Sequence, residues 1–189
     1  GVYLGHLGNW EWITSLPYWT QNATCCQLYH PLENEYFDRL FRYVRERNGA
    51  YCIPMQESLR KILEFKKANK LVIVGYISDQ TPFWWNIHHW LTFLNHDTPV
   101  LTGAERIVKH TDQVFVYGDM KRMKRGHYNC EFKVLREDTK QAKPFEITDE
   151  YFRNMEQSIR QQPEIYLWSH NRWKLSLIHI SEPTRLGMI

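Results

Sequence analysis

Apolar positions in several stretches of the chain recur at the spacing of amphipathic helices. In residues 32–44 they fall three to five positions apart, which predicts a helix that ends near Asn48-Gly49. The same kind of spacing predicts three further helices: over about residues 56–68, over 102–111, and from an N-cap at Thr148 to just before Pro163.

Other stretches carry the patterns of strands. The nearly continuous apolar run 71–77 is typical of a strand covered on both faces, and residues 1–5 and 114–117 are similar. Alternating apolar and polar residues over 128–136 indicate a half-exposed strand. Helices alternating with buried strands, without a linker or repeat, predict a single α/β domain with a largely parallel mixed sheet flanked by helices.

Composition narrows the class of protein. Of the 189 residues, 43% are hydrophobic and 24% charged, which is globular composition. A net charge of +3 supplies no strongly basic face, so we expect no nucleic-acid partner. The four cysteines form no C-x-x-C pair, which argues against a disulfide scaffold or a zinc site. Eight tryptophans suit membrane interfaces and ligand pockets as well as cores.

Both ends of the chain have unusual sequence. Residues 1–5 already read as a core strand, so we expect further sequence upstream. Residues 175–189 do not continue the preceding pattern and resemble translated sequencing adapter, although a strand over 175–180 is the alternative. We therefore expect residues 1–174 to form the domain and 175–189 to be a non-native tail.

A histidine five positions before a carboxylate occurs twice, at His6/Glu11 and His30/Glu35. A carboxylate that accepts one ring N–H fixes the tautomer of the imidazole and stabilises its protonated form, which makes a general base. About one such pair is expected by chance among nine histidines, so context decides. His6 follows a predicted strand, where open α/β sheets place their ligands, and we interpret His30 as structural.

Three further clusters have two interpretations each. The aromatic stretch 83–94 fits core packing and an acyl-chain or membrane-interface surface equally well. His88, His89, His96 and Asp97 lack a known ligand spacing, so we expect no metal. The basic residues at 121–125 suit a solvated hairpin, or contact with anionic lipid or an acidic carrier protein.

Four segments, in order, resemble the lipid A lauroyl/myristoyl acyltransferases within the lysophospholipid acyltransferase superfamily. These are GHLGNWE at 5–11, RERNG at 45–49, SDQ at 78–80 and PEIYLWSHNRWK at 163–174. The resemblance covers essentially residues 1–174 and implies a glycerolipid-acyltransferase-like fold. The membrane-anchoring N-terminal helix typical of that family is not present in this sequence.

The resemblance implies direct transfer of an acyl chain from an acyl-carrier-protein thioester to a hydroxyl of a lipid A precursor or related glycolipid, without a cofactor. His6 would be the base and Glu11 would hold it. Arg45, or Arg47 if the alignment shifts by two, would bind substrate, and Asp79 and Gln80 would shape the site. The resemblance also implies the cytoplasmic face of a bacterial inner membrane.

Two alternatives stay open at this stage. A lysophospholipid acyltransferase would use the same His6 chemistry, but residues 163–174 argue against it. A peripheral membrane-binding module without catalysis would rest on the aromatic stretch and the basic cluster. An intact His6/Glu11 pair within its motif argues against that second alternative.

Overall fold

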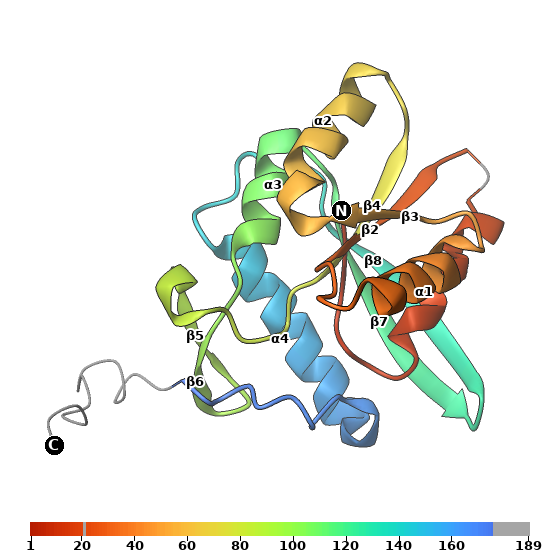
Figure 1. Cartoon of the computed structure of the whole chain (residues 1–189). Helices are drawn as coiled ribbons and strands as arrows, with labels where there is room; N and C mark the ends of the chain where they lie inside the picture. The colour runs from red at the N-terminus through yellow and green to blue at the C-terminus, as the bar shows by residue number, and fades with distance from the viewer. Residues whose placement is uncertain (21, 176–189) are drawn as a thin grey trace, which may run out of the picture.

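The computed structural model describes residues 1–20 and 22–175. Its main element is a six-stranded sheet in the order β3-β2-β4-β1-β7-β8 (Figure 1). The first five of these strands are parallel and β8 is antiparallel. The strands are β1 (Val2–Leu4), β2 (Thr24–Tyr29), β3 (Tyr51–Pro54), β4 (Val72–Ile77), β7 (Phe115–Lys124) and β8 (His127–Arg136).

Four α-helices and several short elements connect or flank these strands. The helices are α1 (Glu35–Glu46), α2 (Ser58–Lys67), α3 (Gly103–Thr111) and α4 (Glu146–Gln161). A two-stranded sheet pairs β5 (Trp90–Phe93) with β6 (His96–Pro99). The described residues also form four 3₁₀ segments: η1 (Trp10–Tyr18), η2 (Met55–Glu57), η3 (Trp84–Asn86) and η4 (Pro163–Ile165). The expected single α/β domain with a mostly parallel mixed sheet is confirmed.

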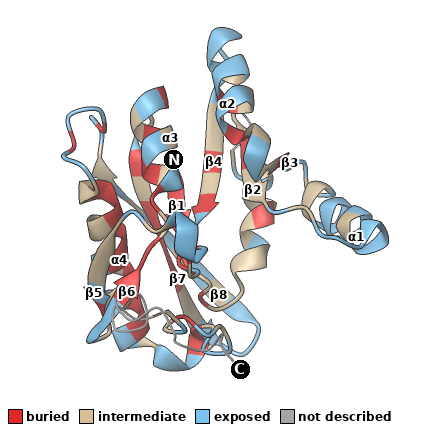
Figure 2. Ribbon diagram, turned by 60° about the vertical axis from the view of Figure 1, so that its left-hand side comes forward, coloured by how far each residue is buried: buried red, intermediate tan, exposed pale blue. Residues whose placement is uncertain are grey.

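The core lies between the sheet and the layer formed by α2, α3 and α4. Tyr3 on the central strand β1 packs against Tyr76, Phe115 and Tyr151, with ring centroids 4.9–5.3 Å apart. The buried Tyr151 hydroxyl donates to the Leu4 carbonyl at 2.7 Å, so helix α4 is tied to the end of β1. Figure 2 shows this buried layer in red along β1, β7 and α4.

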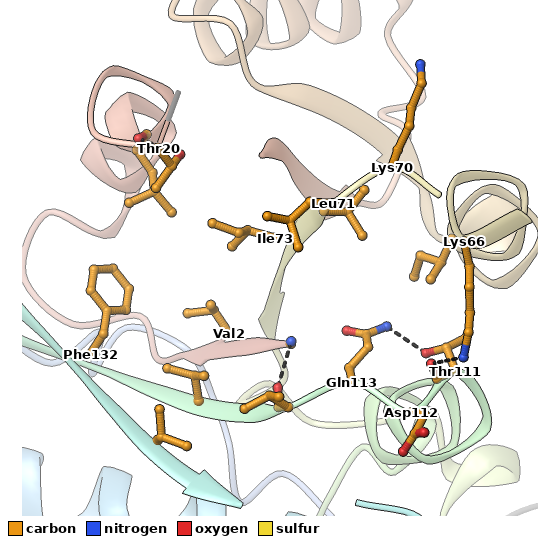
Figure 3. Close-up of a pocket in the computed structure, with 17 residues that line it drawn as sticks. Val2, Thr20, Lys66, Lys70, Leu71, Ile73, Thr111, Asp112, Gln113 and Phe132 are labelled. Atoms are coloured by element: carbon orange, nitrogen blue, oxygen red, sulfur yellow. Dashed lines mark hydrogen bonds between the residues drawn. The ribbon is translucent and has the colours of Figure 1, made fainter. Parts of the chain in front are cut away.

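Residues of the opposite sheet face alternate with those of the core, because neighbouring side chains on a strand point to opposite faces. Val2, Ile73, Val116 and Val134 on that face border a cavity of about 600 Å³ near the amino ends of the strands (Figure 3). Lys66 and Lys70 lie at its edge. Elsewhere this face is covered in part by η1.

Helix α1 differs from the others because none of its residues is buried. It begins at Glu35 rather than at 32, since the Asn34 side chain accepts from the backbone N–H groups of Tyr36 and Phe37 and caps the helix there. Figure 2 shows α1 standing out to one side of the sheet. The apolar stripe that predicted this helix therefore faces solvent in the structure.

Several other expectations need correction. Thr148 is not an N-cap: α4 starts two residues earlier, and the Thr148 N–H and hydroxyl both donate to buried Glu105. Strand β7 continues through Lys124, so most of the basic cluster lies on a strand. The aromatic stretch divides, with Phe93 buried while Trp84 and Trp85 are exposed. The hydrophobic patterns of the sequence do not predict β2, β3 or the β5–β6 hairpin.

The expected tail lies almost entirely outside the described residues, which end at 175. The same holds for the alternative strand over 175–180, so the structure does not decide between them. Among the helices of residues 1–20 and 22–175, none is both long and apolar enough to cross a bilayer.

Candidate active site

His6 lies in a short loop directly after β1, and the C-terminal segment of the described chain, residues 163–175, holds this loop in place. The His6 carbonyl accepts from Leu167 N at 3.1 Å, and Gly8 N donates to the Ile165 carbonyl at 2.8 Å. Gly8 has a φ of +54° and therefore adopts the left-handed conformation that glycine tolerates best. Hydrogen bonds to residues 165 and 167 therefore hold the backbone at His6 and at Gly8.

The imidazole of His6 is paired with a carboxylate from the neighbouring strand. Nδ1 of His6 lies 2.5 Å from Oδ1 of Asp79, and the His6 backbone N–H donates to Oδ2 at 3.2 Å. Asp79 follows β4, which pairs with β1 through Leu4↔Ile77, so both residues leave the sheet at the same edge. A carboxylate accepts in this contact when Nδ1 of His6 carries the proton, and Nε2 is then the nitrogen able to accept one.

This finding changes the expected geometry. We expected Glu11 to hold His6, but the hydrogen bonds that Glu11 makes among the described residues go to Arg45. Arg45 Nε donates to Oε2 at 3.0 Å and the terminal Nη2 donates to Oε1 at 2.6 Å. The planar guanidinium fits a carboxylate with two parallel hydrogen bonds, which a histidine cannot do. The hydrogen bond to Glu11 raises the pKa of Arg45.

Arg172 is the second side-chain partner of Asp79. Its Nε donates to the Asp79 carbonyl at 2.7 Å and its Nη2 to Oδ2 at 3.3 Å, and the side chains of both residues are almost fully buried. The guanidinium also lies 4.7 Å from the centroid of the Tyr166 ring. A buried carboxylate is costly unless it is paired, so the hydrogen bonds from Arg172 offset the cost of burying Asp79 beside His6.

His6, Glu11 and Arg45 open on one cavity of about 410 Å³, together with Trp10 and Gln80. The Trp10 ring packs edge-on against His6 at 5.0 Å. His30, which sequence reasoning set aside as structural, lines the same cavity. Arg47 does not line it; the structure therefore brings Arg45, and not Arg47, to the site.

None of the four cysteines lines this cavity. Burial raises the pKa of Cys26 to about 12 and that of Cys52 to about 11, so both stay protonated thiols at neutral pH. Among the described residues, no group of three or more His, Cys, Asp or Glu side chains is placed to hold a metal ion. The paired ring of His6 is the group in this cavity best placed to move a proton.

Two features of this site are not expected from the sequence. The sequence predicts only that Asp79 shapes the site, and it predicts no role for Arg172. A signal for Asp79 existed, because a charged residue directly after a buried strand must find a partner. Nothing in the sequence indicates that this partner is Arg172, which lies 93 positions further along the chain.

Fold and site together define an α/β protein with a histidine–carboxylate pair at the carboxyl edge of its sheet, suited to acid–base chemistry. Residues 2–175 match the model of the bacterial lipid A biosynthesis acyltransferase family. The chain therefore belongs to this family, which implies acyl transfer to a lipid A-like acceptor. A search of curated proteins gave no match.

The arrangement at Asp79 predicts that removal of its buried partner destabilises the fold. Replacement of Arg172 by methionine leaves a buried carboxylate unpaired on one side and should lower the free energy of unfolding by about 3–5 kcal/mol. The double variant Asp79→Asn/Arg172→Met should recover part of this loss, because it removes the charge as well. Urea unfolding of the single and double variants measures both effects.

Arg153→Met is the matched control on the exposed side of α4, with an expected change within about 0.5 kcal/mol. Equal losses for Arg172→Met and Arg153→Met would contradict this account of Asp79.

Proposed function

We propose that this protein moves a fatty acyl chain from an acyl-carrier-protein thioester to a hydroxyl of a lipid A precursor or a related glycolipid, with His6 as the general base. The observation that carries the proposal is the His6–Asp79 contact of 2.5 Å at the edge of a 410 Å³ cavity, in a chain of this family. The acceptor hydroxyl and the thioester carbonyl would meet beside the His6 ring.

The proposed step needs no covalent enzyme intermediate. Nε2 of His6 takes the proton of the acceptor hydroxyl while the hydroxyl oxygen attacks the thioester carbonyl. The new C–O bond forms, the C–S bond breaks, and the departing thiolate takes the proton back from the imidazolium. Asp79 keeps the proton on Nδ1 and stabilises the positive ring, so it is a positioning residue for His6.

Glu11 and Arg45 have a different proposed role. Their ion pair joins η1 to α1 across the mouth of the cavity, with the Glu11 side chain 42% and the Arg45 side chain 23% exposed. Two of the five N–H donors of Arg45 are used by Glu11, which leaves others for an anionic or carbonyl oxygen of a substrate. Gln80 adds a neutral polar group to the same cavity.

We also propose that the protein works at the cytoplasmic face of a bacterial inner membrane and that the apolar face of α1 contacts the lipid. The polar side of α1 faces the protein: Arg45 binds Glu11, and Glu46 accepts from Cys52 N at 3.1 Å. Its apolar side faces outward, and Tyr36 is 82% exposed. Phe37, Leu40 and Tyr43 lie on that same outward side.

Lipid is the occupant that best fits this face. Phe41 and Leu32 belong to the exposed apolar surface at α1 and also line the His6 cavity, so a lipid substrate could pass from the bilayer to the site along them. Exposed tyrosines and tryptophans, such as Trp19, are typical of membrane interfaces. Arg39 lies beside this apolar side, as cations do on helices that lie at anionic lipid surfaces.

Loss of the base is the first test of the proposed function. His6→Ala should lower the rate of acyl transfer from acyl-carrier protein to a lipid A precursor by about 10²–10⁴-fold, because the hydroxyl loses its proton acceptor. The loss of stability should be smaller than in Arg172→Met, because Asp79 keeps Arg172 and the backbone N–H of residue 6 as partners. Glu35→Gln, the matched control at the chance pair with His30, should keep the rate. Full activity of His6→Ala would refute the assignment.

A second test separates the two carboxylates. Asp79→Asn should lower kcat by about 10²–10⁴-fold with little change in KM, because it disturbs the tautomer of His6 without touching substrate. Glu11→Gln should mainly raise KM, because it removes the carboxylate that accepts both hydrogen bonds from Arg45 and holds it at the substrate cavity. The reverse pattern, with kcat lost in Glu11→Gln and retained in Asp79→Asn, would show that Glu11 orients the base.

The membrane proposal is tested by vesicle binding. Phe37→Ser/Leu40→Ser should weaken binding to vesicles of phosphatidylethanolamine and anionic phosphatidylglycerol by roughly 100-fold, since each side chain contributes about tenfold. Leu71→Ser removes an equally exposed apolar residue at the opposite end of β4 and should have no effect. Unchanged vesicle binding, with loss of a dimer instead, would assign the face to a second copy of the chain.

A further inference from the structure

A second cavity lies between α2 and α3 and adjoins the His6 cavity. It has a volume of about 540 Å³, within the ordinary range for ligand sites. Leu28, Met55 and Ile77 line both cavities, so the two share a wall at the carboxyl ends of β2, β3 and β4. A molecule bound beside His6 would therefore have to cross only these three residues to enter the space between the helices.

The walls of this second cavity are apolar where they meet the shared residues. Met55 is 50% exposed and Leu59 is 39% exposed, although both lie in a cavity and not on a convex surface. Ile107 and Leu101 continue the apolar lining. Arg106 on α3, which makes no ion pair among the described residues, also borders it. Such a lining suits a long aliphatic chain, whose burial removes this apolar surface from water.

The apolar cavity near the amino ends of the strands does not adjoin the His6 cavity. The 600 Å³ cavity in Figure 3 is also apolar, but none of its lining residues lines the His6 cavity. It lies at the amino ends of the strands, whereas His6 and Asp79 follow the carboxyl ends. An acyl chain with its carbonyl carbon beside His6 would have no continuous path into it.

We infer that the cavity between α2 and α3 holds the distal part of the transferred acyl chain, and that Gly103, Ala104 and Ile107 of α3 set the chain length that it accepts. This inference rests on the proposed function. These three residues line the second cavity and not the His6 cavity, so they would contact only the part of the chain beyond the reacting carbonyl. A larger side chain at any of them should exclude long chains and spare short ones.

Gly103 is the best position for the test. A Cβ built on Gly103 has no other atom within 4 Å, and its φ is outside the left-handed region, so a larger side chain fits without strain. Gly103 is also the first residue of α3, where a leucine does not interrupt the helix. The variant Gly103→Leu therefore adds side-chain volume at the lining of this cavity and leaves His6, Asp79 and Arg45 untouched.

The experiment measures transfer and binding for decanoyl and palmitoyl chains. In Gly103→Leu, transfer of palmitoyl from acyl-carrier protein should fall relative to decanoyl by roughly tenfold for every two methylenes excluded. Binding of palmitate and decanoate, followed by displacement of a fluorescent fatty acid, should show the same selective loss. Val134→Phe, which fills the cavity of Figure 3 to a similar degree, should leave both ratios unchanged.

Each result has a distinct meaning. An unchanged palmitate-to-decanoate ratio in Gly103→Leu, with the protein folded by circular dichroism, overturns the inference even if transfer itself is normal. A shift in Val134→Phe instead would place the chain in the other cavity and also overturn it. Ile107→Ala, which enlarges the cavity, should move both ratios toward palmitate. If wild type transfers no acyl chain, the proposed function fails, while the binding ratios still test the cavity.

Discussion

The buried carboxylate of Asp79 is the constraint on which the rest of the site depends. A charge at that depth must be fully paired, and Arg172, the His6 ring and the His6 backbone N–H together supply the partners. These contacts join the end of β1, the end of β4 and the C-terminal segment at one point. The position of His6 therefore depends on residues from three distant parts of the chain, and any displacement of one of them changes the presentation of its Nε2.

Two carboxylates near His6 have different partners: Asp79 in the interior pairs with His6, and Glu11 at the surface pairs with Arg45. Asp79 is buried and faces the imidazole from the sheet side, whereas Glu11 is partly exposed and binds Arg45 across the cavity mouth. The second pair also explains the unusual orientation of α1. Because Arg45 and Glu46 turn their polar side toward the protein, the apolar residues of the helix are left outward. One ion pair thus both closes one side of the cavity and exposes an apolar surface beside it.

The parallel sheet organises the cavities as well. The carboxyl ends of β2, β3 and β4 supply the residues that line both the His6 cavity and the adjoining space between α2 and α3. The amino ends of the strands border an unconnected cavity on the opposite face. Polar chemistry and apolar volume therefore meet at the same edge of the sheet, which is where open α/β sheets bind their ligands.

Local patterns in the sequence determined the class of fold, the four α-helices of the described residues, the strands β1, β4, β7 and β8, and the candidacy of His6, because burial imposes a period of two on strands and of about 3.6 on helices. The tertiary structure alone decided which carboxylate pairs with His6. Spacing along the chain favoured Glu11, five residues away, but hydrogen bonds depend on distance in space, and strand pairing brings Asp79 closer although 73 positions separate it from His6. The tertiary structure also decided that Arg172 pairs with Asp79 and that the apolar residues of α1 face outward. A helical pattern shows that one side is apolar, but only the packed molecule determines what that side contacts.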